Sequence, residues 1–126
     1  MKKYNALLAP EPEEWLALDE LERINLVEIF HEDFEEEVPE GKERIHASIH
    51  VIVENQLIET EYAPIVVKKL IQQGLDRHDA LHAIGAVIAE DLFNIHTSKE
   101  EDDWDEKAYI KRLKNLTAKR WRKGTW

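Results

Sequence analysis

Apolar side chains recur every three to four residues over most of this chain, which is the spacing of an amphipathic helix. The segment that follows Asp19 illustrates the pattern, with apolar residues near helical spacing at Leu21, Ile24, Val27 and Phe34. Asp19 stands where an N-cap is expected, so the pattern predicts a helix over roughly residues 20–34. Pro39 and Gly41 then interrupt it.

Further helices are predicted along the rest of the chain. A turn or two of helix follows Pro12, and longer helices are expected from about Glu43 to Leu57, from Pro64 to a stop at Gly74, and from Arg77 to Ile95 with Asp76 as the cap. A last helix is expected over residues 105–121, begun by Ser98 or by one of the acids at 100–103. The β-branched run at residues 51–53 would also suit a strand, but the surrounding polar spacing favours a helix.

These elements predict one all-α domain over residues 1–126, a small helical bundle of about five helices with short connections. With 126 residues, 43% of them hydrophobic and 35% charged, the chain can bury one core. Residues 117–126 are expected to form a basic C-terminal tail.

Two pairs of histidines, each with i, i+4 spacing, stand out against this background. His46 and His50 lie in one predicted helix, and His78 and His82 lie in another. Residues four apart share a helix face, and on a helical wheel both pairs fall on the apolar stripe. Because short connections favour antiparallel neighbours, the two helices should run in the same direction, with His46 level with His78 and His50 level with His82.

Four inward imidazoles predict a metal site, because unsatisfied buried polar groups are costly and imidazole is a common ligand for transition metals. The predicted ligands are His46, His50, His78 and His82, with Glu54 as a fifth ligand or a supporting partner. Zinc suits four nitrogens, and an added carboxylate would also suit iron, manganese or nickel. Glu90 could complete a second site or orient a histidine.

The sequence leaves other functions open, and it does not decide whether the protein is an enzyme. The histidines could instead form a hydrogen-bonded layer in a non-enzymatic interaction or dimerisation module. The segment from His78 to His82 is similar to the zinc-protease pattern H-E-x-x-H, but Asp79 replaces the glutamate and is one methylene shorter. A di-iron or hemerythrin-like redox site lacks the expected ligand spacing. The single His31 and His96 are expected at the surface or as caps.

Charge and composition bear on the expected partners and the expected cellular location. The net charge is −10, which disfavours nucleic acid as a partner, although residues 111–126 hold seven basic and no acidic side chains. The chain has no cysteine, no signal-peptide pattern and no apolar run long enough to cross a membrane. A cytoplasmic protein is therefore expected, and a homo-oligomer is compatible with the sequence.

The histidine segments resemble a family of short bacterial helical proteins known only as a domain of unknown function. The shared pattern is H-x3-H-x3-E-x-Q-L, carried here by His46, His50, Glu54, Gln56 and Leu57, followed by Pro64 and by H-x2-L-H at His78, Leu81 and His82. Glu90 stands at the position of the family's inward glutamate. The similarity covers roughly residues 15–116 and implies an all-helical fold with a shared histidine site, but no activity.

Overall fold

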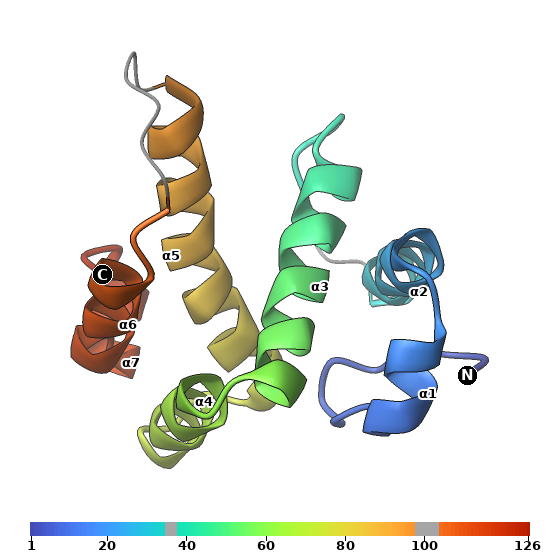
Figure 1. The fold of residues 1–126 in the computed structure, drawn as a ribbon, viewed down its shortest axis with the longest axis horizontal. Helices are drawn as coiled ribbons and strands as arrows, with labels where there is room; N and C mark the ends of the chain where they lie inside the picture. Colours follow the sequence, from blue (N-terminus) through green and yellow to red (C-terminus); the bar gives the residue numbers. More distant parts are fainter. Residues whose placement is uncertain (35–37, 98–103) are drawn as a thin grey trace.

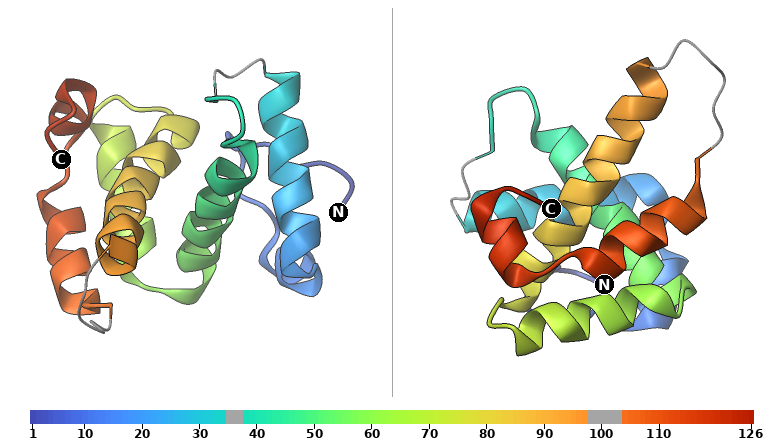
Figure 2. Two further views of the ribbon diagram at one scale, coloured as in Figure 1. Left: turned by 90° about the horizontal axis from the view of Figure 1, so that it is seen from above. Right: turned by 90° about the vertical axis from the view of Figure 1, so that its left-hand side faces the viewer.

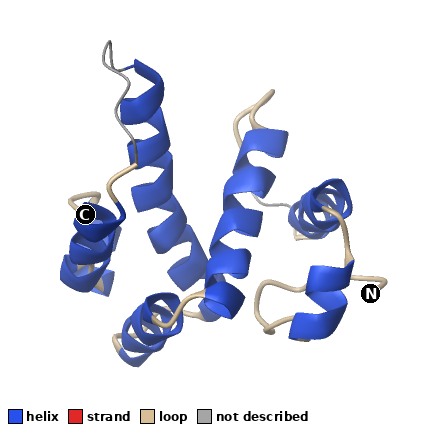
Figure 3. Cartoon of the chain, in the orientation of Figure 1, coloured by secondary structure: helices blue, strands red, loops and turns tan. Residues whose placement is uncertain are grey.

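The computed structural model describes residues 1–34, 38–97 and 104–126, without the side chains of residues 96 and 97. Within these residues the chain is helical and contains no strand (Figures 1 and 3), so the predicted all-α fold is confirmed. The helices are α1 (Pro12–Ala17), α2 (Glu20–Asp33), α3 (Glu43–Glu59), α4 (Tyr62–Gln72), α5 (Arg77–Thr97), α6 (Glu106–Asn115) and α7 (Ala118–Lys123). None of the helices in the described part of the chain is long and apolar enough to cross a membrane.

The helix ends are formed by local capping interactions that the sequence predicts. The side chain of Asp19 accepts a hydrogen bond from the backbone N–H of Glu22, and Asp76 accepts one from the N–H of Asp79, so both predicted caps are confirmed. After α4, Gly74 adopts a φ of +105°, a left-handed conformation that glycine reaches without strain. The N–H of Leu75 bonds back to the carbonyl of Leu70 and closes that helix end.

The C-terminal segment differs from the single helix expected over residues 105–121. Asp105 caps α6, which ends at Asn115, and Thr117 caps α7 by accepting a hydrogen bond from the N–H of Arg120. The break is explained by the extended backbone at Leu116 and Thr117, which buries the side chains of both Leu116 and Ala118. The alternative starts at Ser98 and 100–103 lie outside the described residues. Residues 118–123 of the expected basic tail thus form a helix that contacts α5.

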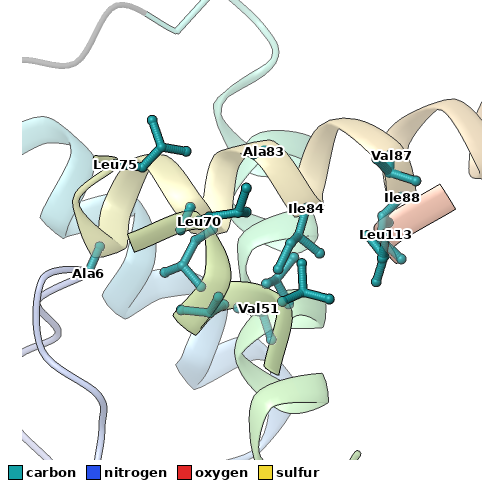
Figure 4. Close-up of a cluster of buried hydrophobic side chains, with 14 of the residues drawn as sticks. Ala6, Val51, Leu70, Leu75, Ala83, Ile84, Val87, Ile88 and Leu113 are labelled. Carbon is teal, nitrogen blue, oxygen red and sulfur yellow. The ribbon is translucent and has the colours of Figure 1, made fainter. Parts of the chain in front are cut away.

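The hydrophobic core lies where α3, α4, α5 and α6 meet. Figure 4 shows part of it, with side chains from α3 (Val51), α4 (Leu70), α5 (Ile84, Val87 and Ile88) and α6 (Leu113) packed together. On the other side of α3, helices α1 and α2 cover a second part of the core (Figure 2), which includes the buried Trp15, Val27 and Phe30. Helix α3 is therefore central and packs on both α2 and α5.

The sequence predicted that α3 and α5 run in the same direction, but in the structure they do not. In Figure 1 they run in opposite senses along the vertical, and in the right-hand view of Figure 2 they cross steeply. The reason is α4, which lies across the ends of both helices instead of running antiparallel to them (Figure 1). Gly85 faces α3 at this crossing, since a Cβ added there would lie 3.2 Å from Cγ2 of Ile49. The absent side chain lets the two helices approach closely.

Candidate metal centre

Five imidazole rings from three helices meet beside the crossing of α3 and α5. His31 comes from α2, His46 and His50 from α3, and His78 and His82 from α5. The ring centroids of His50 lie 5.5 Å from His78 and 5.4 Å from His82, and those of His31 and His50 are 5.1 Å apart. The predicted meeting of the two histidine pairs is thus seen in the structure, and a histidine from a third helix joins them.

Four of these side chains form the tightest group. His31, His50, His78 and His82 each offer a ring nitrogen, and these nitrogens all lie within 4.8 Å of one another. Donor nitrogens in a tetrahedral zinc site lie about 3.4 Å apart, because each is about 2.0–2.1 Å from the metal. Small side-chain shifts of roughly 1 Å would therefore bring the four nitrogens to binding distance.

His46 lies at the edge of this group. Its ring centroid is 4.7 Å from that of His31 and 5.0 Å from that of His82. The expected register paired His46 with His78 and His50 with His82. The expected proximity of His50 and His82 is found, but in the steep crossing His82 also lies near His46, and His50 also lies near His78.

The expectation that His31 lies at the surface or caps a helix is wrong. Its side chain is only 6% exposed, and its ring packs among the other histidines. The sequence did contain a signal, because Ile24, Val27, His31 and Phe34 are spaced i, i+3, i+7 and i+10 along one helix face. The side chain of His96, the other single histidine, lies outside the described residues.

A backbone hydrogen bond orients the ring of His31. Its Nδ1 donates to the carbonyl oxygen of Val27 over 2.8 Å, because the carbonyl can only accept. In the neutral ring this places the proton on Nδ1 and the lone pair on Nε2. Metal-binding histidines are commonly oriented in this way, with one ring nitrogen bonded to a carbonyl and the other on the metal.

Burial favours the neutral form of the clustered histidines. Desolvation lowers the pKa of all five histidines below the usual value, and the pKa of His82 falls to about 3. For His50 the pKa lies well below its usual range, because burial and the neighbouring imidazoles, His82 foremost, all oppose protonation. Neutral imidazole is the form that binds a metal.

His50 is the most isolated of the five from hydrogen-bonding groups. It is 3% exposed, and neither Nδ1 nor Nε2 has a hydrogen-bond partner among the described residues. Its neighbours are ring edges and faces, including Tyr4 with a centroid distance of 5.9 Å. A buried polar group without a partner costs on the order of 1–3 kcal/mol, so the burial of His50 in this arrangement opposes folding of the metal-free chain.

Glu54, the predicted fifth ligand, forms an ion pair in the structure. Its two carboxylate oxygens accept hydrogen bonds from Arg77, at 2.7 Å from Nη2 and 2.9 Å from Nη1, and Oε2 also accepts one from the Tyr4 hydroxyl. Arg77 Nη1 donates in addition to the carbonyl of Ala6 over 2.9 Å. Glu54 is thus buried one turn from His50 but is not among the four grouped residues.

The remaining acidic candidates lie further out. Glu90 is exposed, forms an ion pair with Arg112 at 3.2 Å and accepts a hydrogen bond from the indole of Trp126. Asp79 lines a pocket with Phe34, His78 and His82. The group that could hold a metal ion thus consists of the nitrogen donors of His31, His50, His78 and His82.

Comparison with known proteins adds no relative: no family model, no curated protein and no solved structure matches this chain. The class defined by the fold and the site is an all-helical protein with a buried cluster of histidines that could hold a metal. The resemblance to a bacterial family of helical proteins stays a prediction.

Proposed function

We propose that this protein binds one divalent transition metal, with zinc as the favoured ion, through His31, His50, His78 and His82. The observation that carries the proposal is the group of four buried or half-buried imidazoles whose donor nitrogens lie within 4.8 Å of one another. At its centre, His50 buries two ring nitrogens that have no hydrogen-bond partner in the described part of the chain. A metal would satisfy such a nitrogen.

The donor set favours zinc over harder ions. All four grouped side chains offer nitrogen, which suits zinc, whereas manganese prefers oxygen ligands. The carboxylate of Glu54 is bound by Arg77 and Tyr4, so in this proposal it supports the helices that carry the ligands. His46 is a fifth imidazole next to the four, and iron or nickel remain the other candidate metals.

An interaction module with a hydrogen-bonded histidine layer is the alternative function. That arrangement requires each buried ring to exchange hydrogen bonds with a neighbour. His50 makes none within the described residues, although it is surrounded by imidazoles. This observation favours the metal over the hydrogen-bonded layer.

Elemental analysis of protein purified without an affinity tag tests the proposal. We expect close to one equivalent of zinc per chain, removed by a chelator and restored by added zinc, with a gain in thermal stability on restoration. Less than about a tenth of an equivalent, unchanged after zinc is added to the stripped protein, would contradict the proposal. The variant His50→Ala should not regain the metal, whereas Lys68→Ala on the exposed face of α4 should bind like the parent chain.

A further inference from the structure

A pocket opens onto the histidine cluster from the side of the α3–α5 crossing. It has a volume of about 280 Å³, and His46, His50 and His82 form one part of its wall. The rest of its lining is apolar and comes from α3 and α5, with Ile49 and Leu81 among the larger side chains. The pocket therefore combines an apolar body with nitrogen donors at one place.

Small residues on one face of α5 keep this pocket open. Gly85, Ala86 and Ala89 all line it, and any larger side chain at these positions would reduce its volume. Gly85 has a second constraint, because an added Cβ would crowd Ile49 at 3.2 Å. Ala86 and Ala89 are half-buried, and their size leaves the space unfilled.

The volume indicates the size of molecule that fits. An apolar cavity of about 150 Å³ is large enough for benzene, so a pocket nearly twice that size accepts a molecule of one or two rings. Ligand pockets are typically apolar with a few polar groups that fix the orientation of the ligand. Here those groups are imidazoles, two of which belong to the proposed metal ligands.

We propose that this pocket binds a small, mainly apolar molecule of one or two rings whose single nitrogen or oxygen donor reaches the metal from the side of His46. The inference rests on the proposed metal site and names the class of molecule that the site receives. The metal would gain a fifth ligand from the bound molecule, as zinc sites are able to do. Ile49 and Leu81 would contact the ring system.

Cobalt-substituted protein provides the test, because the visible spectrum of Co²⁺ changes with its coordination number. The probes are 4-phenylimidazole, which has a donor and an apolar body, and imidazole, which has the donor alone. We expect 4-phenylimidazole to change the cobalt spectrum and to bind at least about tenfold more tightly than imidazole, since its phenyl ring is buried. Equal affinity, or binding with no spectral change, would overturn the inference.

Variants that fill the pocket locate the binding. Ala89→Phe and, as a smaller change, Ala86→Leu should weaken 4-phenylimidazole binding at least about tenfold while cobalt remains bound. Ala17→Phe places the same new ring on an exposed position of α1 and should leave the affinity unchanged. Undiminished binding in both pocket variants would also overturn the inference. If the parent chain binds no cobalt at all, the metal proposal itself has failed.

Discussion

Two buried polar groups lie next to each other at α3 and α5, and they differ in how many of their polar atoms are hydrogen-bonded. In the first, the Glu54 carboxylate meets the Arg77 guanidinium in a two-bond pair, with the Tyr4 hydroxyl as an additional donor. In the second, the histidine cluster, His50 buries two nitrogens for which the described chain supplies no hydrogen bond. In the first group both carboxylate oxygens are hydrogen-bonded, whereas in the second the two His50 nitrogens are not, within the part of the chain that the structure describes.

This contrast separates a satisfied polar network from a candidate binding site. Burial alone does not distinguish them, since Glu54 is 1% and His50 is 3% exposed. The distinction comes from whether each buried donor and acceptor finds a partner, because a buried charge is tolerated only when it is paired and hydrogen-bonded. The Glu54–Arg77–Tyr4 network should therefore govern the stability of the chain, and the cluster should govern its affinity for a metal.

The largest effect on stability is expected from breaking the complete network. Glu54→Ala leaves the Arg77 charge, whose side chain is 13% exposed, without its partner and should lower the free energy of unfolding by about 3–5 kcal/mol. Denaturation by urea, followed by circular dichroism, measures this change. The matched control is Glu28→Ala, which removes a more exposed ion pair with Arg44 and should cost less than about 1 kcal/mol. Similar losses in the two variants would show that the Glu54 network has no special role.

The second prediction identifies the ligands of the cluster. His31→Ala should weaken zinc binding more than about 100-fold, which exceeds the effect typical of an outer partner of a metal ligand. His46→Ala should weaken it about 10-fold or less, because His46 is outside the four grouped residues. Competition with a chromogenic chelator measures both constants. The reverse order would favour the set inferred from the two histidine pairs alone, His46, His50, His78 and His82.

The third prediction concerns pH and the metal-free protein. The folded-state pKa of His82 is about 3, and burial lowers the pKa of His50 well below its usual value near 6.5. The unfolded chain therefore binds more protons than the folded chain between these values. The contribution of these neutral histidines to the free energy of unfolding is fully present above pH 6.5. It falls as the pH decreases toward 3, by up to about 1.4 kcal/mol per pH unit for each titrating histidine. Urea midpoints measured between pH 4.5 and 7.5 test this slope.

His82→Gln provides the comparison for that slope, because it removes one buried titrating group and should make stability depend less on pH. A slope that is the same in this variant as in the parent chain would mean that other groups produce the acid sensitivity. Added zinc should also oppose the loss, since protons and metal compete for the same nitrogens.

The smallest effect is expected from trimming the complete network without breaking its ion pair. Tyr4→Phe removes one hydrogen bond to the Glu54 carboxylate, while Arg77 still binds both carboxylate oxygens. A loss of about 1.5 kcal/mol in the free energy of unfolding is expected. Zinc affinity should stay within about threefold of the parent value, since phenylalanine keeps the ring that packs against His50 and only the hydroxyl is removed. A large loss of zinc affinity would show that the network and the cluster act as one unit.

Much of the fold could be predicted from local signals. The caps at Asp19 and Asp76 and the stop at Gly74 depend on residues within a few positions of each helix end, so the sequence displays them directly. The break between α6 and α7 could not be predicted in this way, because Leu116 and Ala118 become buried only when the segment packs against the rest of the chain.

The candidate site was predicted in part for a similar reason. The i, i+4 spacing of His46 and His50 marks one face of a helix and needs no tertiary information. The role of His31 depends on how α2 packs on α3, and its helical spacing is visible only if histidine is counted among the inward residues. The partner of Glu54 could not be predicted either, because Arg77 is 23 residues away and reaches it through the crossing of α3 and α5.

The position of His31 has a consequence for how quickly a bound ion could leave. His50, His78 and His82 belong to the continuous stretch α3–α4–α5, whereas His31 comes from α2, which packs on α3. A metal held by all four would act as a crosslink between α2 and α5. The ion would then lose its bond to His31 when α2 moves away from α3, so the packing of this 14-residue helix would influence the residence time of the metal, together with the pocket that opens between α3 and α5.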